Sequence, residues 1–233
     1  KNGLLDLAHF RETGSARLLK HDPRYVFTYC LPYEYLPDSK CPTFETFISS
    51  ICQSQDEIDF LMEWFGYNLL PSCVMNKILI LYGKGAKNCS SLSLENFDPR
   101  RTFPLASLKG KLANISQEMG RIDNAAEGVL KQIASGEPIT LEEKYKDPKC
   151  VTIDAKLTFA TNVLPKFNDK SDGLWRRLVP FELTKQFLNE SQQDKRLVTP
   201  KFLETSNELS GVLNWSLQSL FKLLDRGYFK IRQ

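Results

Sequence analysis

Apolar positions recur with two different periods along this chain, and each period predicts a different kind of element. In residues 54–71 they follow helical spacing behind Ser54 and Glu57, a pair typical of a capping box, so a helix ending before Pro71 is predicted. Residues 77–82 form instead a short, almost continuous apolar run of strand-forming side chains. Such a run is typical of a strand that is buried on both faces, as in a parallel sheet.

A second group of elements is predicted in the middle of the chain. Residues 111–116 are a further strand candidate, and a helix capped by Asp123 is expected to end before Gly136. Strands that alternate with helices favour a three-layer α/β domain. Residues 151–160 alternate, which predicts one strand with two unlike faces, Val151, Ile153, Ala155, Leu157 and Phe159 on one and Thr152, Asp154, Lys156 and Thr158 on the other.

The chain divides into three expected parts, 1–72, 73–190 and 191–233. The first is rich in aromatic residues and proline, and the last continues from a polar stretch into a long helix, 208–225, that Gly227 should stop. Leucines recur at helical spacing in that helix and mark the face expected to be buried, Leu209, Leu213, Leu217, Leu220 and Leu224.

Composition narrows the class of protein without naming its chemistry. Of the 233 residues, 42% are hydrophobic and 25% are charged, which excludes a disordered, collagen-like or disulfide-scaffold chain. The 31 basic and 28 acidic residues leave a net charge of only +3, so a contact with nucleic acid has to come from a local patch. No apolar run approaches the ~20 residues that span a bilayer. Because the chain begins with Lys1 rather than methionine, we expect it to be part of a longer protein.

The cysteines give no sign of a metal site. The six cysteines contain no CxxC pair, and the chain has only two histidines, so the clustered ligands that zinc requires are missing from the sequence. We expect reduced, mostly buried thiols that pack as small apolar groups.

A glycine-rich turn follows the strand predicted at 77–82. Gly83, Lys84, Gly85 and Ala86 resemble the start of a phosphate-binding loop, in which glycines let backbone N–H groups converge on phosphate oxygens. Ser90 falls where the complete pattern, GxxxxGK[ST], has its magnesium-binding hydroxyl, but the second glycine and the lysine of that pattern are absent.

Two explanations of this incomplete loop are open. A parallel crossover needs a dozen or more residues, usually a helix, and residues 90–103 show no convincing amphipathic pattern. Either a stretch carrying Gly-Lys-Ser/Thr and its helix is missing between Ala86 and Leu92, or the loop is degenerate and has lost ATP binding. An intact mass that matches this sequence would exclude the missing stretch.

A series of short strings adds a family resemblance that covers nearly the whole chain. They lie at 2–7 with 21–23 and 29–35, then at 65–67, 82–86, 110–118, 135–139, 144–148, 159–165, 172–178 and 208–215. In this order they resemble the superfamily 3 helicase module of phage and plasmid primase-helicases, a group that includes the poxvirus primase-helicase. The resemblance implies a three-layer AAA+ P-loop ATPase core at 73–190, a mainly helical pre-helicase domain at 1–72 and a helical C-terminal segment.

The resemblance also assigns roles around the phosphate loop. Glu118, behind the strand predicted at 111–116, stands where the family has its Walker B acid, which holds Mg²⁺ and polarises the attacking water. Gln117 occupies a position where many members carry a second acid, and Ser90 would supply the other ligand to Mg²⁺. Asn162 matches sensor 1, an amide that contacts the terminal phosphate or orients the water.

An arginine finger is implied at Arg176 or Arg177, with a slight preference for Arg177. A guanidinium that reaches the γ-phosphate held by a neighbouring subunit stabilises transition-state charge, and the other arginine of the pair would form a structural ion pair.

A DNA-gripping hairpin is implied at Lys144, Tyr145 and Lys146, because basic groups beside an aromatic ring suit a phosphate backbone and a base face. Lys111 and Lys131 are weaker candidates for contacts with DNA.

The implied function is an ATP- and Mg²⁺-dependent DNA helicase of a phage, virus or mobile element, acting in the host cytoplasm and not at a membrane. The resemblance implies a homo-oligomeric ring, a hexamer, with single-stranded DNA in its channel and a primase domain upstream of residue 1. Two alternatives are open: an ATPase-deficient, ring-forming DNA-binding module, and a P-loop enzyme that does not act on DNA.

Overall fold

The computed structural model describes residues 2–25, 30–83, 102–116, 124–142, 145–162, 172–187, 194–199 and 205–230, together with residues 97, 164 and 202. The chain forms two compact units. One comprises residues 1–66 and 187–233, and the other comprises residues 67–186. The two ends of the chain therefore fold together, and the middle of the chain forms a unit of its own.

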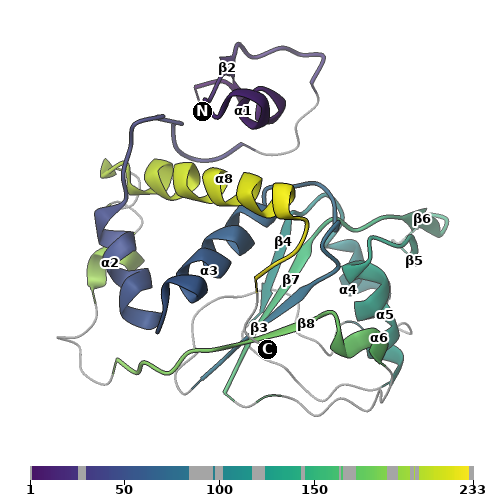
Figure 1. The fold of residues 1–233 in the computed structure, drawn as a ribbon. Helices are drawn as coiled ribbons and strands as arrows, with labels where there is room; N and C mark the ends of the chain where they lie inside the picture. The colour runs from purple at the N-terminus through teal and green to yellow at the C-terminus, as the bar shows by residue number, and fades with distance from the viewer. Residues whose placement is uncertain are drawn as a thin grey trace. The chain divides into compact units, whose positions relative to one another are not determined.

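The 67–186 unit is built on a four-stranded parallel sheet (Figure 1). Its strand order is β4 (Ala113–Ser116), β7 (Lys156–Thr161), β3 (Ile78–Tyr82) and β8 (Leu178–Glu182), and all three pairings are parallel. The first three residues of β3 are buried, because the strand lies between two neighbours and carries apolar side chains on both faces. The parallel sheet predicted from residues 77–82 is thus confirmed, as is the strand expected at 111–116.

Helices of this unit pack their apolar sides on the sheet (Figure 1). They are α4 (Thr102–Ala106), α5 (Asn124–Ala134) and α6 (Asp172–Trp175). Leu130 and Ile133 of α5 and Leu174 of α6 join Leu157 and Phe159 of β7 in one buried cluster. The helix predicted before Gly136 is confirmed, and that glycine has the left-handed φ of 66° typical of a helix end. Its expected cap, Asp123, lies outside the described residues.

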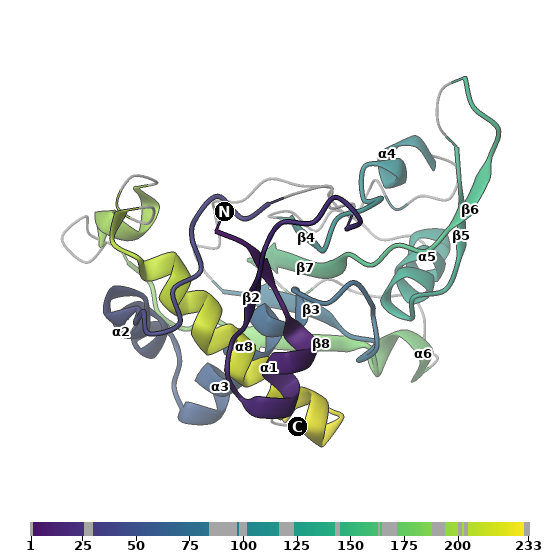
Figure 2. The same cartoon turned by 90° about the horizontal axis from the view of Figure 1, so that it is seen from above.

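The single strand predicted at 151–160 is wrong. Residues 149–151 form β6 (Lys149–Val151), which pairs antiparallel with β5 (Ile139–Leu141), and this hairpin extends away from the sheet (Figure 2). β7 begins only at Lys156 and does not alternate, since Lys156 and Thr158 are buried like their apolar neighbours. The reason is tertiary: Leu157 and Phe159 pack in the buried cluster with α5 and α6, and on the other side of the strand the Lys156 ammonium group donates to the Leu70 carbonyl.

The other unit is mainly helical. Ser54 Oγ accepts a hydrogen bond from the N–H of Glu57 at 3.3 Å, as in the predicted capping box, but the Glu57 carboxylate accepts from the N–H of Gln53 rather than that of Ser54, at 2.6 Å. The helix ends at Tyr67, four residues before Pro71. The elements of this unit are β1 (Leu4–Leu5), α1 (Leu7–Thr13), β2 (Leu18–Leu19), α2 (Pro42–Ile51), α3 (Gln55–Tyr67), the 3₁₀ turn η3 (Lys195–Val198) and α8 (Glu208–Arg226).

Helix α8 matches the long helix expected near the C-terminus. Leu213, Leu217 and Leu220 are buried as predicted, but Leu223 is buried where Leu224 was expected. Gly227 ends the helix with a φ of 81°. Within the described ranges, no helix combines the length and the apolar character needed to cross a membrane.

Polar residues of α8 attach the segment before α2 to the helix. The buried carboxylate of Glu208 accepts hydrogen bonds from the backbone N–H groups of Thr43 (3.0 Å) and Phe44 (3.2 Å), and so caps α2 from a distant part of the chain. The Asn214 amide donates to the carbonyls of Leu36, Pro37 and Ser39 at 2.8–3.0 Å. The string at 208–215, one of those behind the family resemblance, therefore has a structural explanation.

The cysteines are less buried than predicted. Cys41 and Cys73 are buried, but Cys30 and Cys150 are exposed and Cys52 lies between these extremes. All five described cysteines are free thiols, and Cys89 lies outside the described residues.

Candidate functional site

The carboxyl edge of the parallel sheet brings two predicted site residues together. Tyr82 at the end of β3 stands opposite Thr161 at the end of β7, and the N–H of Gly83 donates to the Thr161 carbonyl at 3.1 Å. Asn162 follows directly and is exposed. In open parallel sheets, ligands bind at this edge, so Gly83 and Asn162 lie where a nucleotide site is expected.

Gly83 also has a packing role that does not depend on a ligand. The N–H of Leu183 donates to the Tyr82 carbonyl at 2.7 Å, which holds the chain beyond β8 close to Gly83. A Cβ atom at position 83 would lie 2.2 Å from the Leu183 carbonyl oxygen, a distance that no side chain can occupy. Glycine is therefore required here by the sheet itself.

Glu182, a carboxylate that no sequence motif marks, lies at the same edge. The Tyr82 hydroxyl donates to Glu182 Oε2, across the β3–β8 pair, at 3.3 Å. Partial burial and the negative charge of Glu182 raise the pKa of Tyr82, so the phenol stays protonated.

Several predicted site residues lie outside the described part of the chain. They are Lys84, Gly85, Ala86 and Ser90 of the phosphate loop, Glu118, and Lys144 of the hairpin. The segment between Ala86 and Leu92, for which two explanations were open, lies there too. The roles expected of these residues stay predictions.

Arg177, at the opposite edge of the sheet, is bound within its own unit. Its guanidinium donates from Nε and Nη2 to Ser135 Oγ at 3.0 and 2.6 Å, and from Nη1 to the Gly173 carbonyl. Its own carbonyl accepts from the N–H of Ile78 at 2.8 Å. The side chain is half-buried, and it joins the ends of α5, α6 and β3.

Arg176 differs from its neighbour because its side chain is exposed. Its carbonyl accepts a hydrogen bond from Lys77 Nζ at 2.5 Å, and among the described residues no carboxylate pairs with its guanidinium. Burial, followed by the positive charges of Arg176 and Arg177, lowers the pKa of Lys77. No sequence motif marks Lys77, and its position directly before the buried strand was the only signal that could have identified it.

Arg176 and Gly83 lie at opposite ends of paired strands. β3 and β8 run parallel, with Ile78 opposite Leu178 and Tyr82 opposite Glu182. Gly83 follows the last of these pairs, whereas Arg176 precedes the first. At a rise of about 3.3 Å per residue, the length of the strands alone separates the two edges by roughly 16 Å. Arg176 is therefore remote from Gly83 of its own chain.

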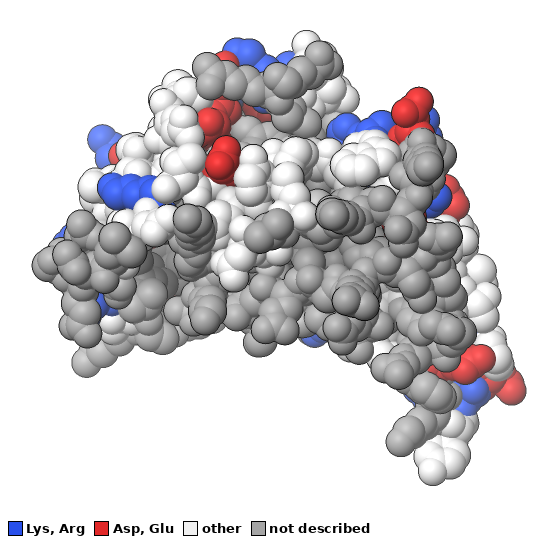
Figure 3. Space-filling model, turned by 90° about the horizontal axis from the view of Figure 1, so that it is seen from below, with Lys and Arg blue, Asp and Glu red and all other residues white. Residues whose placement is uncertain are grey.

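The hairpin β5–β6 carries the remaining described candidates. Tyr145 is fully exposed, with a left-handed φ of 62°, and Lys146 is exposed beside it in the connection between the two strands. On the face of the molecule seen in Figure 3, the visible basic and acidic side chains are interspersed. This agrees with the small net charge of the chain.

Two family models match separate stretches of the chain. Residues 1–53 match a family described as D5 N terminal like, and residues 72–177 match a family described as of unknown function, DUF5906. A protein of Acanthamoeba polyphaga mimivirus that bears the name of a helicase is 30% identical over 93 residues. This alignment covers 40% of the present chain and 10% of the mimivirus protein.

Solved structures show the same fold at low sequence identity. Two structures of the NrS-1 C-terminal region align with a TM-score of 0.56 each, at 10% and 12% identity. They cover 84% and 95% of this chain, which in turn spans 51% and 57% of the NrS-1 chains. The chain thus spans about half the length of these structures and a tenth of its mimivirus relative.

Proposed function

We propose that this chain, which is of the viral and phage primase-helicase type, is the ATP-dependent DNA helicase module of a replication protein. The D5 N-terminal likeness and the helicase name of the mimivirus relative support a helicase-related role in replication. One observation carries the ATPase part of the proposal: Arg176 is exposed at the sheet edge opposite Gly83 and Asn162. A cation in this position is suited to a nucleotide that another copy of the chain holds.

ATP with Mg²⁺ is the proposed cofactor, at the carboxyl edge of the sheet. The exposed amide of Asn162 beside Gly83 fits this ligand, since an amide N–H donates to phosphate oxygens. Glu118 and Ser90 would hold Mg²⁺, which neutralises charge on the phosphates when bound, and Glu118 would also orient the attacking water. The residues proposed to surround the phosphates are Gly83, Lys84, Gly85, Ala86 and Ser90.

Arg176, rather than Arg177, is the proposed arginine finger. Arg177 already donates hydrogen bonds to Ser135 and Gly173. If its side chain moved to reach a neighbouring subunit, these half-buried groups would lose their hydrogen-bond donor. Within the described part of the chain Arg176 donates no such side-chain bonds, and its neighbour Trp175 is 51% exposed. Tryptophan and arginine are enriched at the centres of protein interfaces. Trp175 and Arg176 therefore support a subunit contact at the sheet edge where the parallel strands begin.

The hairpin is proposed to grip a single DNA strand through Lys144, Tyr145 and Lys146. In a hexameric ring of three-layer AAA+ cores, six hairpins would concentrate positive charge in the channel although each chain carries little net charge. A primase domain upstream in a longer chain completes the proposed replication protein.

The proposal is tested by sizing the purified chain with and without single-stranded DNA and nucleotide, alongside an ATPase assay. We expect an assembly larger than a monomer and ATP hydrolysis that single-stranded DNA stimulates. ATP hydrolysis that DNA leaves unchanged would instead favour a P-loop enzyme that does not act on DNA, and the absence of any assembly would contradict the ring.

Mixing two inactive variants tests whether the finger acts between subunits. Glu118→Gln and Arg176→Ala should each lose ATPase activity alone. In a mixed ring, some interfaces combine the intact Glu118 of one chain with the intact Arg176 of the next, so activity should return. If mixing restores no activity although the variants co-assemble, Arg176 does not act on a neighbouring site.

A second candidate function is an ATPase-deficient, ring-forming DNA-binding module. The stretch at 83–90 favours it, since the second glycine and the lysine of the phosphate-loop pattern are absent. This candidate predicts assembly and DNA binding without ATP hydrolysis, and the same two measurements distinguish it.

A further inference from the structure

Lys149 lies on the apolar face of the β5–β6 hairpin. The register places Lys149 opposite Leu141 and Val151 opposite Ile139, so these four side chains share one face of the hairpin. Leu141 and Ile139 are buried and Val151 is half-buried, whereas Lys149 is exposed. A lysine on such a face covers apolar neighbours with its stem and keeps its ammonium group in solvent.

Lys109 reaches the same place from a different part of the chain. It belongs to the turn after α4, where its N–H donates to the Ala106 carbonyl at 3.2 Å. Leu105 and Leu108 are buried in the core of the unit and anchor this turn. The exposed Lys109 side chain is therefore presented from a rigid support next to the hairpin.

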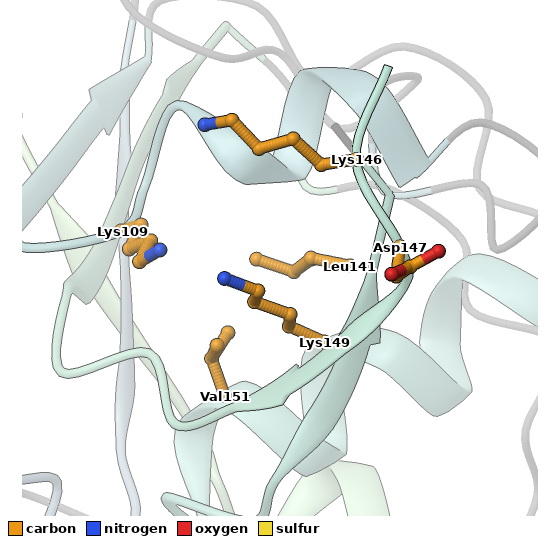
Figure 4. A pocket seen from close by; sticks show the side chains of 6 residues that line it. All are labelled: Lys109, Leu141, Lys146, Asp147, Lys149 and Val151. Carbon is orange, nitrogen blue, oxygen red and sulfur yellow. The ribbon is translucent and has the colours of Figure 1, made fainter. Parts of the chain in front are cut away.

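A pocket lies between this turn and the hairpin (Figure 4). Leu141 and Val151 form its apolar part, and three lysines, Lys109, Lys146 and Lys149, extend their ammonium groups toward the same side of it. Among the described residues that line the pocket, Asp147 is acidic, and its carboxylate points away (Figure 4).

We propose that this lysine pocket, formed by Lys109, Lys146 and Lys149, binds a backbone phosphate of single-stranded nucleic acid. A phosphate placed among three ammonium groups is attracted by each of them. The inference rests on the proposed function and extends it, because it adds Lys109 and Lys149 to the hairpin contact. A strand whose base stacks on the exposed Tyr145 ring would continue past Lys146 to the pocket at the base of the hairpin.

The test measures binding of a fluorescent oligothymidylate to the full chain over a range of salt concentrations. Lys109→Gln and Lys149→Gln remove the charges and keep much of the side-chain stems, and Lys185→Gln, on an exposed lysine that does not line the pocket, is the matched control. Loss of one phosphate contact should lower the salt slope by about 0.7, which amounts to about fivefold weaker binding at about 0.1 M salt. Thermal unfolding of each variant checks that it is folded. Lys149→Arg keeps the positive charge, so it should bind the oligonucleotide like the wild type and unlike Lys149→Gln.

Each outcome decides a separate point. If Tyr145→Ala weakens binding but both pocket variants keep the wild-type affinity and salt slope, the pocket is rejected and the hairpin contact stands. If the wild-type chain binds no oligonucleotide, the DNA part of the proposed function fails together with this inference. ATP affinity, measured separately, should not change in the pocket variants. Loss of ATP affinity with unchanged oligonucleotide binding would assign the pocket to nucleotide phosphates and overturn the proposal.

Discussion

The guanidinium of Arg177 donates two hydrogen bonds to the single hydroxyl oxygen of Ser135, from Nε at 3.0 Å and from Nη2 at 2.6 Å. This contact joins the end of α5 to the residue that precedes β8, so it belongs to the framework of the α/β unit. Arg176, in contrast, has an exposed side chain, so it is the one of the two arginines that is presented to another molecule.

Substitution of the two arginines should therefore have opposite effects. Arg177→Ala leaves Ser135 and the Gly173 carbonyl without their donor, and we expect the free energy of unfolding to fall by about 1–3 kcal/mol. Arg176→Ala should change it by no more than about 0.5 kcal/mol and still reduce ATP hydrolysis by roughly a thousandfold. Urea unfolding and an ATPase assay measure the two effects. A stable Arg177→Ala without activity, beside an active Arg176→Ala, would reverse the assignment.

The buried ion pair of the helical unit should contribute more to the free energy of unfolding than the exposed ion pair of the same unit. Arg226 Nη2 lies 2.5 Å from Glu63 Oε2, and only 5% of the Glu63 side chain is exposed. Arg226→Ala leaves a buried carboxylate without its partner, at a cost of about 3 kcal/mol in unfolding free energy. Lys230→Ala, which removes the exposed pair with Asp56, is the control and should change stability little. Equal effects in chemical denaturation would contradict this ranking.

Lys156 should make stability depend on pH. Its ammonium group donates to the Leu70 carbonyl and lies 5.2 Å from the centre of the Tyr67 ring. Burial lowers its pKa from 10.5 to about 8, an effect that Cys73 and Asp154 partly oppose. Between these two values the unfolded chain binds more protons than the folded chain, so the Lys156 contribution to the unfolding free energy rises with pH.

The pH effect is measured as a difference between two proteins. Unfolding free energies of the wild type and of Lys156→Met are compared from pH about 7 to about 10, and the wild type should gain stability relative to the variant above pH about 8. The difference cancels the groups that do not interact with Lys156 and keeps the Lys156 contribution together with its coupling to Cys73 and Asp154. A constant difference across the range would show that Lys156 titrates normally.

Two helix glycines should respond oppositely to alanine. A Cβ atom on Gly66 of α3 would lie 2.3 Å from the Ser216 carbonyl oxygen and 2.7 Å from Leu220 Cβ of α8, so Gly66→Ala forces the helices apart. We expect a loss of about 3 kcal/mol in unfolding free energy. On Gly128 of α5, no described residue beyond its chain neighbours and its own helix backbone comes within 4 Å of the corresponding position, and Gly128→Ala should stabilise the protein by up to about 1 kcal/mol. Thermal unfolding midpoints that move in the same direction would contradict this.

Local patterns correctly predicted those helices and strands in which apolar side chains are buried and polar side chains are exposed. The apolar run at 77–82 indicated a strand buried on both faces, and the helices at 55–67 and 208–226 followed from periodicity and end signals. The same reasoning predicted the wrong strand at 151–160. A charged residue such as Lys156 is expected to be exposed to solvent unless the carbonyl that accepts its hydrogen bond is known. That acceptor, Leu70, is 86 residues away in the chain.

The sequence by itself determined the parallel sheet, the glycine turn after its central strand and the order of strings that resembles primase-helicases. These signals are local, because the spacing of apolar residues, the residues that favour turns and the short sequence strings all depend on residues that are close together in the chain. Only the tertiary structure decided that Arg177 is bound to Ser135 while Arg176 is exposed, and that Lys109 joins Lys146 and Lys149 around one pocket. The sequence cannot distinguish two adjacent arginines, and it cannot show that lysines far apart in the chain lie around one pocket. The contacts that decide both points form only when distant segments pack together.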